Sequence, residues 1–167
     1  MEIRQMLLPE FEAEMEKTRA MLERIPEGKQ EYKPHEKSMP LGKLAAHTAQ
    51  LSELVTYVIE LPHLDFSQSS MTPLVMESRQ QLLKDFDALV DKARKAIASA
   101  DDEHWQKQWK LSFQGQTIVE EPRFLVYRSM FLNHMVHHRA QLGVYLRLND
   151  IPLPPTYGPS ADDRMGF

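Results

Sequence analysis

Apolar residues recur at intervals of three and four in four long stretches of the chain, and this spacing predicts four amphipathic helices. Helix-breaking residues mark their limits, because Pro26 and Pro62 follow the first two stretches. The third stretch begins at Thr72-Pro73, a capping residue followed by proline at the first helical position. The predicted helices cover residues 3–25, 41–61, 73–100 and 122–149.

Two segments depart from the helical pattern. Before Gly115, Trp109, Leu111 and Phe113 alternate with polar residues, which favours a short β-hairpin, or otherwise a long loop, between the third and fourth helices. From Ile151 onward the chain is too rich in proline to be helical, so we expect an extended tail over the bundle. The predicted fold is all-α: a four-helix bundle in one domain over residues 1–167, with that loop or hairpin and an extended C-terminal tail.

Composition narrows the classes of partner. The 167 residues are 42% hydrophobic and 26% charged, which is typical of one soluble domain. The 20 basic and 24 acidic residues form no basic block, so neither nucleic acid nor an anionic membrane is indicated. The acidic N-terminus is unlike a signal peptide and no apolar run would span a membrane, so we expect a cytoplasmic location. Without cysteine, any metal must be held by histidine, carboxylate or water.

Three histidines interrupt the apolar stripe of the fourth predicted helix, His134, His137 and His138. His134 and His138 lie one turn apart on the side that should face the core, a spacing at which one helix supplies two ligands to a transition metal. His137 lies three residues from His134 and is the alternative partner. A lone histidine on an apolar face is more often a hydrogen-bonded core residue. Two on one stripe need partners for all their ring nitrogens, which makes metal binding an equally favoured hypothesis.

A useful metal site needs at least one further ligand. His47 lies between Leu44 and Leu51 on the buried stripe of the second predicted helix, so it can face the bundle interior. Two histidines from one helix and one from another would leave an open coordination position, as in catalytic metal sites. The remaining histidines stand in loops or at helix ends and are expected at the surface: His35, His63 and His104.

Other metal motifs do not fit. The histidine run lacks the glutamate of the zinc protease motifs, and the single Glu60-x-x-His63 pair of a di-iron bundle is broken by proline. No carboxylate near the stripe is placed to act as a general base for water, which favours a thiol nucleophile. Neighbouring polar residues that could orient the ligands are Gln50, Asn133 and Gln141.

The run His-x-x-His-His-Arg-x-Gln-Leu, the histidine of the second helix and the tail Tyr-Gly-Pro-Ser-Ala-Asp together resemble the DinB/YfiT-like family over nearly the whole chain. The resemblance implies an up-up-down-down-like four-helix bundle, frequent homodimers, and a divalent metal, often nickel or zinc, bound by three histidines. His47, His134 and His138 match those ligand positions. One departure is Ala140, where many relatives have glycine.

Similar proteins in the wider superfamily include S-transferases that use low-molecular-weight thiols such as bacillithiol or mycothiol. The resemblance therefore implies a metal-dependent transferase that conjugates such a thiol to a small electrophilic substrate. A metal with an open position lowers the pKa of a bound thiol, and a chain without cysteine would receive that thiol as a cosubstrate. The alternatives are a metal-dependent hydrolase and a non-catalytic, stress-related metal-binding bundle.

Overall fold

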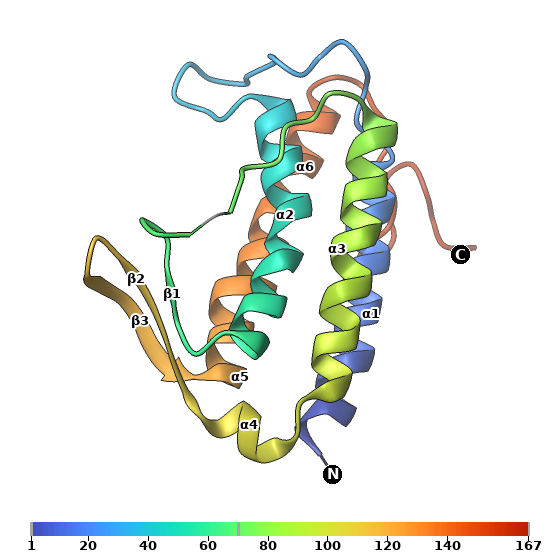
Figure 1. The fold of residues 1–167 in the computed structure, drawn as a ribbon. Coiled ribbons are helices and arrows are strands. Elements are labelled where there is room, and N and C mark those ends of the chain that lie inside the picture. The colour runs from blue at the N-terminus through green and yellow to red at the C-terminus, as the bar shows by residue number, and fades with distance from the viewer. Residues whose placement is uncertain (1, 70, 167) are drawn as a thin grey trace.

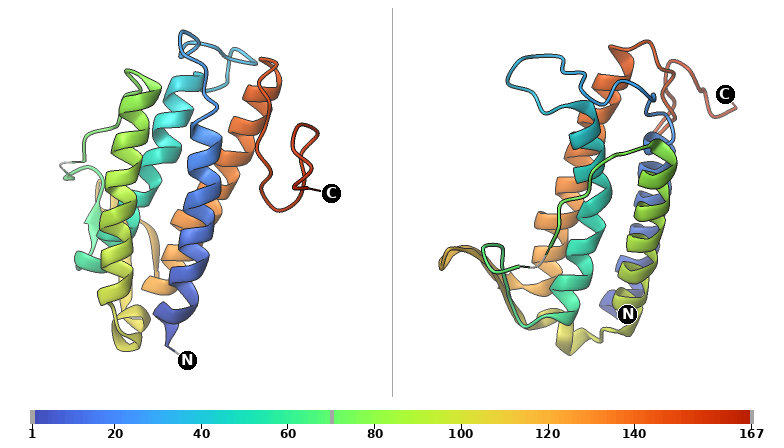
Figure 2. Two further views of the ribbon diagram at one scale, coloured as in Figure 1. Left: turned by 90° about the vertical axis from the view of Figure 1, so that its right-hand side faces the viewer. Right: turned by 45° about the horizontal axis from the view of Figure 1, so that its top comes forward.

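The computed structural model describes residues 2–69 and 71–166. Four long helical segments lie side by side, and a small sheet flanks one end of the bundle (Figures 1 and 2). The first three segments are α1 (Ile3–Leu22), α2 (Leu41–Glu60) and α3 (Arg79–Ser99). The fourth segment is one continuous helical run made of three parts: α5 (Arg123–Val126), the π-helix η1 (Tyr127–Asn133) and α6 (His134–Arg147). A short helix, α4 (Asp102–Gln106), precedes the last two strands of the sheet.

The directions of the four helical segments differ from the up-up-down-down arrangement that the family resemblance implied. In Figure 1, α1 runs upward, α2 and α3 both run downward, and the last segment runs upward again. The connection between α2 and α3 must therefore return along the length of the bundle. Helix α3 packs against α1 and α2, and α6 packs against α2 and α1, so that α2 and α6 face each other directly.

The predicted apolar stripes supply the core between these helices. Phe11, Leu44, Phe86 and Phe131, one from each long segment, are at most 1% exposed. Burial of each such side chain contributes about 1.5–3 kcal/mol, so the core should form without any bound ion. Among the described residues, no helix combines the length and apolar character needed to cross a membrane.

Helix α3 begins at Arg79, later than the Thr72-Pro73 signal predicted, so that prediction was wrong. The actual N-cap is Ser78, whose side chain accepts a hydrogen bond from the backbone of Gln81. The preceding segment stays extended because Gln50 of α2 binds both the carbonyl of Thr72 and the N–H of Leu74, each at 2.9 Å. The Thr72 carbonyl, which a helix starting at Pro73 would pair with the N–H of Met76, is paired with the Gln50 amide instead. A long-range contact therefore overrides the local capping signal.

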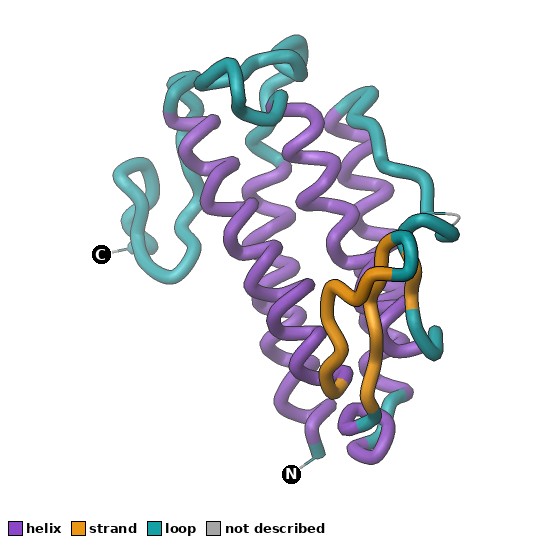
Figure 3. The backbone as a smooth tube through the Cα atoms, turned by 90° about the vertical axis from the view of Figure 1, so that its left-hand side faces the viewer, coloured by secondary structure: helices purple, strands orange, loops and turns teal. Residues whose placement is uncertain are grey.

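The all-α prediction also needs correction, because the alternative of a hairpin forms and a third strand joins it (Figure 3). Strands β2 (Gln108–Phe113) and β3 (Gln116–Pro122) are antiparallel. Gln114 and Gly115 turn between them with φ of 51° and 76°, the pair of positive values that a two-residue type I′ turn requires. Strand β1 (Leu64–Asp65) lies parallel to β2. Because β1 has only two residues, it shows no alternation of apolar and polar positions from which the strand could have been predicted.

The C-terminal tail is extended, as predicted. From Ile151 to Gly166 it contains neither helix nor strand and passes beside α6 and α1 (Figure 2). An ion pair between Arg147 of α6 and Asp162 holds it at one point. Tyr157 anchors it at a second point, through bonds to buried groups described below.

Candidate metal centre

The structure brings His47 of α2 together with His134 and His138 of α6. One ring nitrogen of each histidine lies within 4.8 Å of the corresponding atoms of the other two. The ring centroids are 5.3 Å apart for His47 and His134, 4.7 Å for His47 and His138, and 4.6 Å for His134 and His138. We call these three residues the histidine triad. Its members are half-buried where α2 and α6 face each other.

The structure does not bring His137, the alternative partner of His134, into this group of histidines. His137 is exposed and lies outside the triad, although its ring neighbours that of His138. His35 and His63 are exposed, as expected. His104 was expected to be solvated, and this was wrong: it is half-buried, and its Nε2 lies 2.7 Å from the carbonyl oxygen of Ile59.

The π-helix η1 sets the direction of α6. A π-helix has a wider turn than an α-helix, so it changes the rotation of every side chain that follows it. His134 is the first residue of α6, and its Nδ1 lies 3.3 Å from the carbonyl oxygen of Met130 in η1. Hydrophobic spacing alone does not reveal such a segment. π-helical turns frequently occur at functional sites.

Hydrogen bonds orient two of the triad rings in the same way. Nδ1 of His134 faces the Met130 carbonyl, and Nδ1 of His138 faces Oε1 of Gln141 at 2.8 Å. An acceptor opposite Nδ1 favours the tautomer that carries its proton there, which leaves the lone pair on Nε2. The two Nε2 atoms then face each other at 2.8 Å. At this distance the pair forms a hydrogen bond if one ring carries its proton on Nε2, and offers two lone pairs to one cation if both rings carry it on Nδ1.

Burial disfavours the protonated form of two triad rings, His47 and His138. Burial, with smaller contributions from His138, His134 and Lys43, lowers the pKa of His47 to about 4. Burial also lowers the pKa of His138, against an opposing effect of its bond to Gln141. Both rings are therefore neutral at pH 7, and neutral imidazole is the form that binds a metal.

The spacing of the triad suits an ion bound by imidazole. Nitrogens held at about 2.1 Å from one ion lie roughly 3.0–3.4 Å apart. The Nε2 atoms of His134 and His138 are 2.8 Å apart, and all three ligand nitrogens lie within 4.8 Å of one another, so the spacings in the triad bracket that range. Small side-chain rotations would bring the three nitrogens to that spacing.

Of the three residues expected to orient the ligands, Gln141 makes the contact just described. Asn133 is exposed. Gln50 lies one turn from His47, but its amide binds the extended segment before α3 and Glu53.

Comparison with known proteins identifies the family of the chain. The model of the DinB family matches residues 2–164. The chain belongs to the DinB family. A DinB-like protein from Bacillus cereus ATCC 10987 has 17% sequence identity and a TM-score of 0.70, covering 93% of this chain and 98% of that one. A DinB-like protein from Bacillus subtilis has 18% identity and a TM-score of 0.68, covering 91% and 97%. At these identities the two structures support the fold alone. No curated protein matches the chain.

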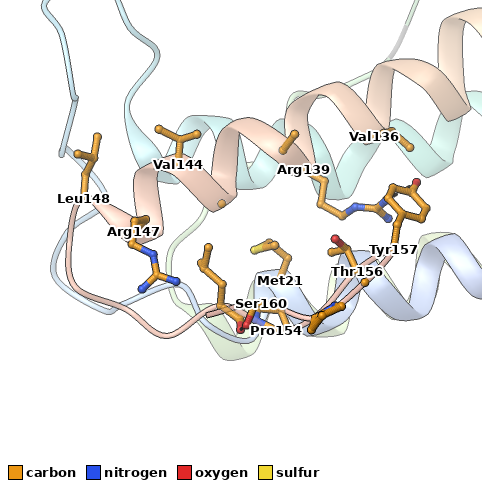
Figure 4. Close-up of a pocket in the computed structure, with 15 residues that line it drawn as sticks. Met21, Val136, Arg139, Val144, Arg147, Leu148, Pro154, Thr156, Tyr157 and Ser160 are labelled. Atoms are coloured by element: carbon orange, nitrogen blue, oxygen red, sulfur yellow. Dashed lines mark hydrogen bonds between the residues drawn. The ribbon is translucent and has the colours of Figure 1, made fainter. Parts of the chain in front are cut away.

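Arg139, the arginine of the His-His-Arg run, has a structural role that the sequence analysis did not predict. Arg139 is 2% exposed, and its side chain extends from α6 toward Tyr157 of the tail (Figure 4). Its Nη2 donates to Glu14 Oε2 at 2.6 Å and to the Tyr157 hydroxyl at 2.7 Å, and its Nη1 donates to the backbone of Glu14 and to Thr18. Arg139 thus joins the helix of the triad to α1 and to the tail.

Glu14 remains ionised beside Arg139. Burial opposes its ionisation, but hydrogen bonds from Lys17, Tyr157 and Arg139 outweigh that effect and lower the pKa of its carboxyl. The signal available in the sequence was a glutamate on the apolar stripe of α1, between Phe11 and Thr18. A charge in such a position requires a partner.

Proposed function

We propose that this DinB-family protein is a metal-dependent enzyme in which His47, His134 and His138 hold one divalent ion. The observation that carries the proposal is the pair of Nε2 atoms facing each other at 2.8 Å, with both Nδ1 atoms already opposite carbonyl oxygens. With both Nδ1 atoms occupied in this way, the Nε2 lone pairs of His134 and His138 are available to an ion that a nitrogen of His47 can also reach. Nickel and zinc are the favoured ions, because imidazole suits both and they bind more tightly than manganese.

The bound ion would lower the pKa of a coordinated thiol or water and so supply a nucleophile at neutral pH. The chain's own groups prepare the site for this. Burial favours the neutral form of His47 and His138, the Met130 carbonyl and Gln141 orient two of the rings, and three protein ligands leave a position open.

Among the possible reactions, we propose the conjugation of a low-molecular-weight thiol to a small electrophile. No carboxylate is among the described residues that line the cavity beside the triad, so water would lack a general base there. A coordinated thiol loses its proton to solvent and needs no such base. Because the chain has no cysteine, the thiol would be a cosubstrate. Hydrolysis is the less supported alternative, and the homodimer that the resemblance implied remains a prediction.

Calorimetric titration of the metal-free, untagged protein tests the metal site. We expect about one nickel or zinc ion per chain, and loss of tight binding in His47→Ala and in His138→Ala. His137→Ala is the matched control, because it removes an adjacent but exposed histidine outside the triad. Unchanged affinity in His47→Ala would refute the three-histidine site.

Spectroscopy of the cobalt-loaded protein tests the thiol. A small thiol added at neutral pH should produce a sulfur-to-metal charge-transfer band, and its conjugation to an electrophile should accelerate only when the metal is present. If millimolar thiol leaves the spectrum of the loaded protein unchanged, the transferase is excluded in favour of a hydrolase or a non-catalytic metal-binding protein.

A further inference from the structure

A cavity of about 200 Å³ opens directly beside the histidine triad. Two triad members, His47 and His134, form part of its wall. Most of the remaining wall is apolar and comes from α2, from the strand-to-helix connection after β1, and from η1. Its other lining residues are Gln50, Leu51, Leu54, Phe66, Met71 and Met130.

The size and chemistry of this cavity define what fits. An apolar cavity of about 150 Å³ in a protein accommodates benzene, so one of 200 Å³ takes a single aromatic ring or a branched alkyl group of similar size. No lysine, arginine, aspartate or glutamate is among the described lining residues. A charged group placed there would lose its hydration without gaining a partner. The occupant is therefore uncharged and apolar.

A larger groove elsewhere on the protein does not meet these conditions. It encloses about 530 Å³ between α6 and the tail (Figure 4), and none of the triad residues lines it. The two arginines at its wall, Arg139 and Arg147, are already paired with Glu14 and Asp162. Proximity to the triad, rather than size, distinguishes the smaller cavity.

Gln50 builds one wall of the smaller cavity. Its side-chain carbonyl accepts from the N–H of Leu74, and its amino group donates to the carbonyl of Thr72 and to Glu53. Glu53 is itself held by the hydroxyl of Tyr57 at 2.7 Å. Met71 immediately precedes this clamped segment and lines the cavity. A single amide on α2 thus fixes the segment that closes the cavity next to the triad.

We propose that this cavity binds the apolar part of the substrate or thiol, an uncharged group about the size of one aromatic ring, whose reactive end lies at the metal, and that Gln50 is the residue that positions its wall. The proposal rests on the metal-dependent function inferred above. It adds a selectivity that the triad alone does not provide, because three imidazoles and an ion make no contact with the apolar part of a thiol.

The test compares two thiols that offer the metal the same donor atom. On the cobalt-loaded protein, benzyl mercaptan should bind at least tenfold more tightly than 2-mercaptoethanol, since burial of one ring contributes about that factor or more. In Met130→Trp, which fills the cavity from a half-buried position, the ratio of the two dissociation constants should fall toward one. Val144→Trp is the matched control, because it places the same ring in the larger groove and should leave the ratio unchanged.

Gln50→Ala tests the positioning role. It should reduce the same ratio several-fold while the calorimetric affinity for the metal stays as in the wild type, because Gln50 contacts no triad ring among the hydrogen bonds of the structure. A ratio near one in the metal-loaded wild type, or a full ratio in Met130→Trp, would overturn the inference.

A separate experiment tests the cavity if the proposed metal-dependent function is wrong. If calorimetry detects no metal, the metal-dependent enzyme is excluded, and the cavity is tested without metal by fluorine NMR with fluorobenzene. Binding to the wild type and to Val144→Trp, with loss in Met130→Trp, would support an apolar binding cavity. Absence of binding to the wild type would overturn it.

Discussion

Replacing Glu14 by glutamine should destabilise the protein by about 3–5 kcal/mol, because it leaves the buried guanidinium of Arg139 without its counterion. The Arg139 side chain is 2% exposed and that of Glu14 is 9% exposed, so water cannot replace the lost charge. For a protein of this size, each kcal/mol of stability corresponds to about 2–4 °C, so the melting temperature should fall by roughly 6–20 °C.

A double-mutant cycle separates the ion pair from other effects. Arg139→Met removes the guanidinium but keeps much of its volume, and the double variant Glu14→Gln/Arg139→Met leaves neither charge unpaired. We expect the double variant to be more stable than the sum of the single changes predicts, with a coupling of at least about 2 kcal/mol. Urea denaturation followed by circular dichroism at pH 7 measures all four proteins.

The same pair of helical segments offers a matched control. Glu10 of α1 and Arg128 of η1 form an ion pair at 2.8 Å whose side chains are 36% and 46% exposed. Glu10→Gln should therefore cost at most about 1 kcal/mol. If Glu14→Gln costs no more than Glu10→Gln, or if the cycle is additive within about 0.5 kcal/mol, the reasoning from burial is refuted.

Three further outcomes are expected. Gln141→Leu should weaken calorimetric metal binding about 10–100-fold by freeing the ring of His138, and unchanged affinity would show that the bond to Gln141 does not orient it. Hydrogen bonds from Ser67, and a further one from Ser112, lower the pKa of Asp65 to about 2, so its contribution to stability is complete above about pH 4 and is lost as the pH falls toward 2. Asp65→Asn should flatten the melting temperature across that range, and curves parallel to the wild type would contradict this. Chelation should lower the melting temperature by some degrees yet leave the far-ultraviolet circular dichroism helical, and loss of helicity would mean that the metal is needed for folding.

Much of the fold and of the site was predictable from local features. Prolines after the first two stretches placed the ends of α1 and α2 within three residues, and the spacing of apolar residues identified the core. The i, i+4 spacing of His134 and His138, with His47 on the stripe of another helix, marked the residues that the structure brings together. Such signals are visible because each depends on residues only a few positions apart.

Only the tertiary structure decided the features that depend on distant partners. Helix α3 starts at Arg79 with Ser78 as its N-cap, and Gln50, 24 residues before Leu74, pairs with the backbone that the local cap signal predicted to be helical. Arg139 is paired with a glutamate 125 residues away, and strand β1 exists only through its pairing with β2. The choice of His138 over His137 follows from the rotation of α6 after η1 and from the position of α2. Hydrophobic periodicity records which face of a segment is buried, but the partner against which it is buried is set by the packing of the whole chain.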